Sequence, residues 1–150
     1  MLYITRYSYL KITTSTMPLQ IKHILIADDD IDDIDLFKSA MLEMCPDLKV
    51  SVAYNGVNLL DLLPTISLPD TIILDLNMPL IGGKECLVKI RSQYQFDEVP
   101  IIIFSTSRHQ RDIEYCLAEG ANHYIVKPNT YSGLKTIVEK LCEGRLSNVN

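Results

Sequence analysis

Charged residues stand directly after three short apolar segments of the chain. Asp28 and Asp29 follow residues 23–27, Asp75 follows residues 71–74, and Lys127 follows residues 124–126. If these segments are parallel strands of one sheet, their charged side chains meet at its carboxyl edge, where open α/β sheets build their sites. Carboxylates crowded at one edge repel one another, so either their pKa values rise or a cation is recruited. The pattern therefore indicates a metal-dependent site for phosphate chemistry.

The oxygen atoms expected at this edge suit a hard cation. Mg²⁺ prefers one or two carboxylates, waters and a phosphate oxygen as ligands. The ligands from the protein would be Asp29, Asp75 and a backbone carbonyl near Asn77. Asp75 is also a candidate nucleophile, because carboxylates form acyl phosphates during phosphoryl transfer. The metal would stabilise charge at the transferring group.

A hydroxyl and an ammonium are expected at the same place. A fourth apolar segment ends in Ser105, whose hydroxyl can hydrogen-bond a phosphoryl oxygen beside Asp75. The Lys127 ammonium can pair with the same group, as a compact charge on a flexible stem. Metal, acceptor, hydroxyl and cation would then surround one phosphoryl position.

The elements that must position these residues are read from the hydrophobic pattern. Apolar strand-length segments alternate with segments of helical period, which is typical of βα units. Strands are expected near 23–28, 48–53, 70–75, 100–105 and 122–126, with helices between them and at the C-terminal end. The second strand alternates apolar and polar residues, which marks an edge, whereas strands one, three and four are almost wholly apolar. We therefore predict a doubly wound, flavodoxin-like three-layer α/β sandwich with strand order 2-1-3-4-5.

Composition limits the class of protein. The chain has 150 residues, 47% of them hydrophobic, and a net charge of −5, which suits one domain and argues against direct binding of nucleic acid. No apolar stretch reaches the ~20 residues needed to cross a bilayer, so we expect no membrane contact and a cytoplasmic protein. The cysteines are expected to be reduced thiols that fill helix faces: Cys45, Cys86, Cys116 and Cys142. Residues 1–20 are expected to be a disordered extension or to precede the true start, 21–144 to form the domain, and 145–150 a short tail.

From about Lys22 to Glu143 the chain resembles the receiver domain of two-component response regulators, of the CheY-like, single-domain type. The resemblance covers all five strand ends in the right order. It implies that Asp75 is the phosphoacceptor, and that Asp28 and Asp29 are the acidic pair of the Mg²⁺ site. Asn77 would ligate the metal through its carbonyl.

The same resemblance assigns the remaining site residues. Ser105 stands at the position of the switch hydroxyl, Tyr124 at that of the aromatic rotamer switch, and Lys127 at that of the family's lysine. Phosphorylation is expected to draw the Ser105 hydroxyl toward the phosphate and so open space into which Tyr124 turns.

The resemblance also implies partners. A sensor histidine kinase or a histidine phosphotransfer protein would phosphorylate Asp75. Output would come from docking to a downstream protein through the fourth helix, fifth strand and fifth helix, since no output domain follows in this sequence; the resemblance also allows a homodimer. The protein would be a switch and not an enzyme, with at most self-phosphorylation and self-dephosphorylation.

Alternatives follow from the same residues. A Mg²⁺-dependent phosphohydrolase with an aspartyl nucleophile commonly needs a second acid two positions after it, where this chain has Asn77. A receiver that binds partners without phosphorylation is disfavoured, because every site position is chemically competent. Asp30 is expected to add to the metal site or to cap the following helix, and Asp32, Asp33 and Asp35 to form a solvated helix start.

Overall fold

The fold is a five-stranded parallel sheet between two layers of helices, in a computed structural model that describes residues 20–146. The strand order is β2-β1-β3-β4-β5, as predicted. The strands are β1 (His23–Ala27), β2 (Lys49–Ala53), β3 (Thr71–Leu74), β4 (Ile101–Ser105) and β5 (His123–Val126). Each begins and ends within one residue of its predicted position.

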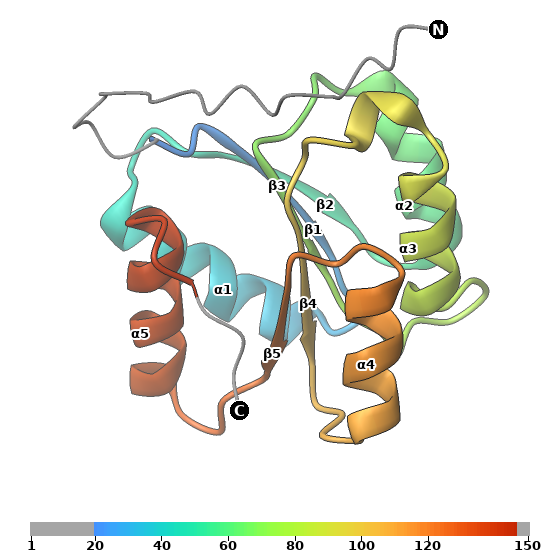
Figure 1. Ribbon diagram of the computed structural model, residues 1–150. Coiled ribbons are helices and arrows are strands. Elements are labelled where there is room, and N and C mark those ends of the chain that lie inside the picture. Colours follow the sequence, from blue (N-terminus) through green and yellow to red (C-terminus); the bar gives the residue numbers. More distant parts are fainter. Residues whose placement is uncertain (1–19, 147–150) are drawn as a thin grey trace, which may run out of the picture.

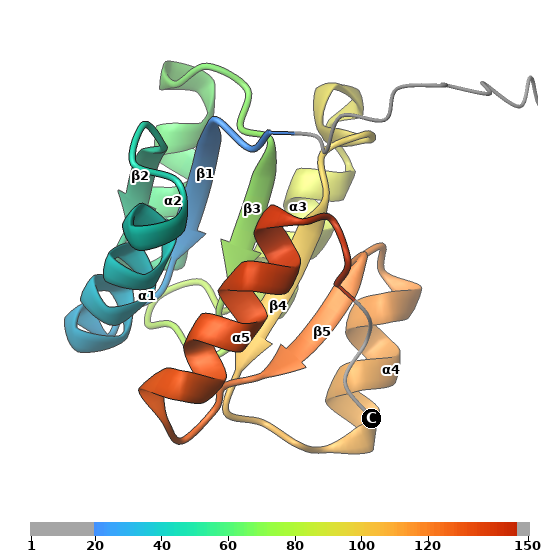
Figure 2. The ribbon, with the colours of Figure 1, turned by 90° about the vertical axis from the view of Figure 1, so that its left-hand side faces the viewer.

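Helices cover both faces of the sheet (Figures 1 and 2). The helices are α1 (Ile31–Met44), α2 (Gly56–Leu62), α3 (Gly83–Arg91), α4 (Gln110–Ala118) and α5 (Tyr131–Cys142), with short 3₁₀ turns η1 (Leu63–Thr65) and η2 (Tyr94–Phe96). Figure 2 shows α1 and α5 side by side on one face, and Figure 1 shows α2, α3 and α4 on the other. The chain thus forms the predicted three-layer sandwich.

Strand periodicity divides the core into two halves. Along β1, Ile24 and Ile26 pack toward α1 and α5, whereas Leu25 and Ala27 pack toward α2 and α3. Successive side chains of a strand point to opposite faces, so a strand buried on both faces must be apolar throughout. β2 pairs only with β1 and its residues before Ala53 are partly exposed, which explains its alternating sequence.

Strand pairing fixes the functional edge. β1 and β3 are parallel neighbours with Ala27 opposite Leu74, so the next residues, Asp28 and Asp75, leave the sheet side by side. The Asp75 N–H donates to the Ala27 carbonyl at 2.9 Å, which continues the pairing by one residue. The register therefore places the two carboxylates together.

The acidic segment after β1 begins α1. Asp30 is the N-cap, and its carboxylate accepts hydrogen bonds from the backbone N–H groups of Asp32 and Asp33. Such a cap satisfies amides that have no partner inside the helix. The capping interpretation of Asp30 is confirmed.

The predicted N-terminal extension and most of the predicted C-terminal tail lie outside the described residues. Among residues 20–146, no helix combines the length and apolar character that a bilayer crossing needs.

Gly83 gives a test of how closely α3 approaches the end of β3. A Cβ atom at Gly83 would overlap the carbonyl oxygen of Asp75, whereas one at Gly82 would lie 3.6 Å from its nearest neighbour. We expect Gly83→Ala to lower the free energy of unfolding by about 2 kcal/mol or more, and Gly82→Ala by under about 1 kcal/mol. Chemical denaturation of both variants measures this difference, and equal costs would contradict the close contact.

Candidate functional site

Three carboxylates converge at the carboxyl edge of the sheet. Asp28, Asp29 and Asp75 each offer an oxygen within 4.8 Å of the others. Asp28 and Asp75 are buried, with exposures of 4% and 5%, whereas Asp29 faces solvent. The structure thus brings together the predicted acidic residues, and oxygen atoms in this arrangement suit a hard divalent cation. Asn77, the fourth predicted ligand, is exposed in the loop that follows Asp75.

Burial controls the charge of Asp75. Desolvation raises its pKa to about 6; the nearby Lys127 lowers it and the Asp28 carboxylate raises it further. The Asp75 Oδ1 atom accepts a hydrogen bond from the Leu76 N–H at 2.9 Å, which fixes the orientation of the carboxylate. Asp28 also has a raised pKa, mainly through burial, although its hydrogen bond with Lys127 works in the opposite direction.

Lys127 supplies the positive charge of the site. It follows β5, where its N–H donates to the Ser105 carbonyl at 2.8 Å. Its ammonium lies 2.7 Å from Asp28 Oδ2, 2.8 Å from Asp33 Oδ2 and 3.9 Å from Asp75 Oδ2. Burial lowers the Lys127 pKa, but the hydrogen bonds with Asp28 and Asp33 outweigh it and the pKa is raised. Lys127 is therefore a cation held within reach of Asp75.

The pairing of Asp33 with Lys127 corrects one expectation. The sequence predicts that Asp33 belongs to a solvated helix start, and its side chain is indeed 37% exposed. It nevertheless extends from the first turn of α1 to the ammonium. No motif marks this role, because it depends on the direction in which α1 leaves the site.

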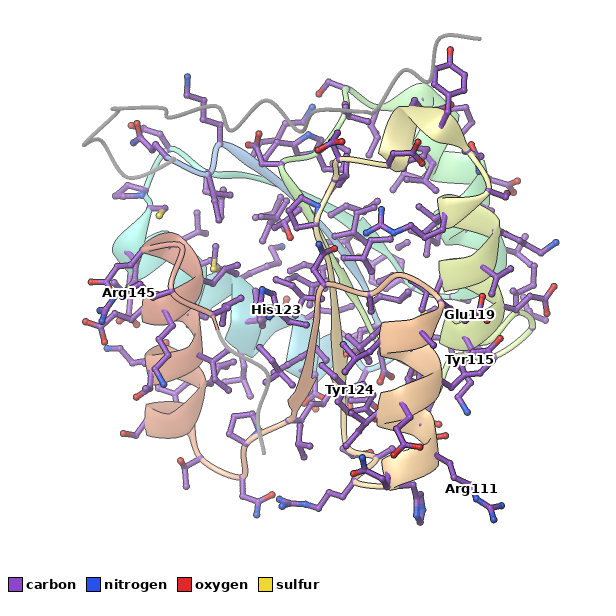
Figure 3. The ribbon with its side chains drawn as sticks, in the orientation of Figure 1. Arg111, Tyr115, Glu119, His123, Tyr124 and Arg145 are labelled. Carbon is purple, nitrogen blue, oxygen red and sulfur yellow. The ribbon has the colours of Figure 1, made fainter. Side chains whose placement is uncertain are left out.

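Ser105 and Tyr124 lie on the other side of Asp75. Ser105 ends β4, the neighbour of β3, and is fully buried; its hydroxyl accepts the Ser107 N–H at 3.3 Å. Tyr124 is 1% exposed, and its hydroxyl donates to the Ser107 carbonyl at 2.9 Å. Figure 3 shows Tyr124 between the sheet and α4, whereas Arg111 extends away from α4. The Tyr124 ring is therefore buried in this structure.

A polar chain extends from Ser107 to α3. The Ser107 hydroxyl donates to the Asp112 carboxylate in the first turn of α4, and Lys84 of α3 donates to the other carboxylate oxygen. These hydrogen bonds, Lys84 first and then Ser107, lower the pKa of Asp112. The loop after Ser105 is therefore connected to both α3 and α4. No motif in the sequence indicates this connection.

Known proteins share the fold of this chain. The family model described as "Response regulator receiver domain" matches residues 24–139. A chemotaxis protein CheY homolog from Campylobacter jejuni is 32% identical over 116 residues, which cover 77% of this chain and 88% of the relative.

Two solved structures share the architecture. The phosphorylated cyanobacterial phytochrome response regulator RcpA is 30% identical, with a TM-score of 0.78 over 87% of this chain and 97% of its own. The Mn(2+)-bound form of response regulator Rcp1 is 22% identical, with a TM-score of 0.74 over 86% of this chain and 99% of its own. At this identity the similarity is one of fold.

The raised pKa of Asp75 predicts how stability depends on pH without divalent metal. Since folding raises this pKa from 3.8 to about 6, the folded protein holds a proton between these pH values that the unfolded chain has released. Stability contributed by this proton is present at low pH and is lost as the pH rises through about 6. At neutral pH we expect Asp75→Asn to be more stable than the wild type by about 3 kcal/mol, from 1.36 kcal/mol per pKa unit.

Urea denaturation at several pH values measures this effect. The advantage of Asp75→Asn is expected to vanish near pH 4, about the unfolded pKa. Asp61→Asn, on an exposed position of α2, controls for the loss of one negative charge. An advantage of Asp75→Asn that does not change with pH would contradict the assignment.

Proposed function

Because this chain belongs to the response regulator receiver family, we propose that it is a phosphorylation switch whose acceptor is Asp75. Receiver domains of this family are phosphoacceptor switch proteins and not classical enzymes. The observation that carries the assignment is the convergence of Asp28, Asp29 and Asp75 within 4.8 Å, with the Lys127 ammonium 3.9 Å from Asp75. Nucleophile, metal ligands and cation thus meet at one position.

Each residue has a distinct role in the proposed transfer. An Asp75 oxygen attacks phosphorus and displaces the donor's imidazole, which gives an acyl phosphate. Asp28, Asp29, Asp75 and the Asn77 carbonyl would hold Mg²⁺, which supplies charge neutralisation at the transferring group. The Lys127 ammonium, 3.9 Å from Asp75 Oδ2, would pair with a new phosphoryl oxygen, and the Ser105 hydroxyl would donate to another.

Lys127 also maintains the site before phosphorylation. Two buried carboxylates that lie side by side repel each other, and the ammonium between Asp28 and Asp33 offsets part of that repulsion. When phosphate arrives, Lys127 exchanges a carboxylate partner for a phosphoryl oxygen. The Lys127 ammonium thus offsets negative charge both before and after phosphorylation.

The competing phosphohydrolase function has weaker support. Asn77 stands where such an enzyme would place its second acid, and an amide cannot exchange a proton as a general acid or base.

The proposed partners follow from the family. Receiver domains are phosphorylated by histidine kinases or phosphotransfer proteins. We assign the output surface to α4, β5 and α5, where Arg111 and Glu114 of α4 and its C-cap Glu119 are exposed, while Tyr124 lies beneath. Ser107 connects this surface to the site, since it contacts Ser105, Tyr124 and Asp112.

The proposed switch starts from Tyr124 in its buried position. The Ser105 hydroxyl oxygen accepts a hydrogen bond from the Ser107 N–H. A phosphoryl group that draws this hydroxyl toward itself would weaken that hydrogen bond. The Ser107 loop, with the hydrogen bonds to Tyr124 and Asp112, would then shift. Charge-assisted hydrogen bonds contribute on the order of 1.5 to 3 kcal/mol, enough to change the population of two packings but not the fold.

The acceptor assignment is tested with a small phosphodonor and Mg²⁺. We expect hydroxylamine-labile label on Asp75 of the wild type and at least ~100-fold less incorporation in Asp75→Asn, because the amide is not a nucleophile. Peptide mapping locates the label, and Asp61→Asn is the matched control. Label on another residue, or undiminished labelling of Asp75→Asn, would refute the assignment.

The metal assignment predicts opposite effects at two positions. Asp29→Ala is expected to weaken Mg²⁺ binding at least ~10-fold, since it removes a carboxylate ligand. Lys127→Ala should keep or tighten the binding, because the ammonium repels the ion, while phosphorylation slows. Titration calorimetry with Mg²⁺ measures both, and the roles are wrong if only the lysine variant loses the ion.

The switch is tested by amide hydrogen exchange with and without beryllofluoride. In the wild type we expect protection to change at the site, in the Ser107 loop and in α4. In Ser105→Ala, the change is expected to remain near the metal site, because the hydroxyl that transmits it is absent. Changes that reach α4 equally well in Ser105→Ala would contradict the mechanism.

A further inference from the structure

Two cysteines that are distant in sequence lie in contact at the end of the sheet opposite to Asp75. The Sγ atoms of Cys45 and Cys142 are 3.3 Å apart, although 97 positions separate the residues. Cys45 is the C-cap of α1 and Cys142 is the last residue of α5. Both are free and partly exposed, whereas Cys86 and Cys116 are fully buried. The two pairs therefore differ in access to solvent.

We propose that Cys45 and Cys142 form a reversible intramolecular disulfide when the protein meets a hydroperoxide. This modification joins the C-terminal ends of α1 and α5. It does not require the phosphoacceptor function of Asp75, so each proposal can fail without the other.

The geometry favours bond formation within one chain. A disulfide bond is about 2.05 Å long, so the sulfur atoms must approach by about 1.2 Å from their present contact. Cys45 has backbone angles of φ −133° and ψ 79°, outside the helical region, while its N–H still donates to the Met41 carbonyl at 2.8 Å. Rotation of two side chains at helix ends can supply this approach.

Neighbouring contacts hold the two helices in the required register. Glu43 of α1 accepts a hydrogen bond from Tyr131 at 2.8 Å and an ion pair from Lys135 at 2.7 Å, both on α5. The buried residues Met41 and Leu141 belong to the same core cluster, one turn or less before the cysteines. The thiols are therefore held as neighbours by contacts that do not involve sulfur.

The chemistry balances with the peroxide as sole oxidant. The Cys45 sulfur attacks the terminal peroxide oxygen, the O–O bond breaks, and sulfenic acid and water (or an alcohol) form. The Cys142 sulfur then attacks the Cys45 sulfur, and the departing hydroxide takes the Cys142 proton as water. Two thiols lose two electrons in all, and the peroxide gains them.

The surroundings assign the order of attack. Burial, with the hydrogen bond to Cys45 as a second cause, raises the pKa of Cys142 to about 12, so this thiol stays protonated. Cys45, which is partly exposed, also lines a surface cavity of about 310 Å³ with Ile21, Met44 and Pro46, whereas Cys142 is not among the lining residues. Cys45 is thus the peroxide-reactive residue and Cys142 the resolving one.

The cross-link would restrain α5 without touching the site. α1 begins beside Asp75 and runs for 14 residues to Cys45, which places the disulfide roughly 20 Å from the site at 1.5 Å per residue. We expect oxidation to slow amide exchange in the last turn of α5 several-fold. Phosphorylation of Asp75 by a small phosphodonor should be unchanged.

The test uses the full chain treated with hydrogen peroxide under denaturant-free conditions. We expect the wild type to lose two of its four thiols, to remain a monomer on a non-reducing gel, and to yield a peptide pair that joins Cys45 to Cys142. Dithiothreitol should restore all the thiols. Cys142→Ser should stop at a Cys45 sulfenic acid, which dimedone traps, and Cys86→Ser with Cys116→Ser should still form the cross-link.

Three results would overturn the proposal. These are a peptide map that links other cysteines, a cross-linked dimer whose yield rises with protein concentration, and a disulfide at Cys45 that still forms in Cys142→Ser. The peptide map of the wild type identifies which cysteines are joined, even if a serine variant does not fold.

Discussion

Repulsion between two buried carboxylates is the constraint around which this protein is arranged. The parallel pairing of β1 with β3 brings Asp28 and Asp75 together, and burial raises the pKa of both. An apolar replacement would stabilise the fold but would leave neither a nucleophile nor a metal ligand. The folded protein instead keeps two carboxylates that repel each other. A cation, or a phosphoryl group with its metal, can relieve this repulsion.

Lys127 links that edge to the rest of the molecule. Its backbone is fixed by β5 beside β4, while its ammonium reaches β1 and the first turn of α1. A change at Asp75 therefore alters the partners of a side chain that spans the sheet. On the other side, Ser105 of β4 contacts Ser107, which contacts Tyr124 and α4. Lys84 extends this chain of contacts to α3. The site is thus coupled to both helical layers through named contacts.

The two ends of the sheet have different chemistry. Acids, hydroxyl and lysine gather at the carboxyl edge, where strands end and helices begin. At the opposite edge, α1 and α5 end beside each other and bring the Cys45 and Cys142 thiols into contact. Because α5 contributes to both the proposed output surface and the cysteine pair, phosphate and oxidant would act on one element from its two ends.

The sequence by itself determined the strand order, the strand ends and the gathering of Asp28, Asp29 and Asp75. These follow from local patterns: apolar strands, an alternating edge strand, and charged residues placed directly after them. The family resemblance added the roles of Ser105, Tyr124 and Lys127, which remain proposals. Only the tertiary structure decided which partners these residues have.

Asp33 bonds Lys127 because of the direction in which α1 leaves its cap, and Tyr124 is buried because α4 packs over β5. Cys45 meets Cys142 because two helices distant in sequence end at the same level. Contacts of this kind depend on the packing of whole elements against one another. No residue spacing along the chain encodes that packing.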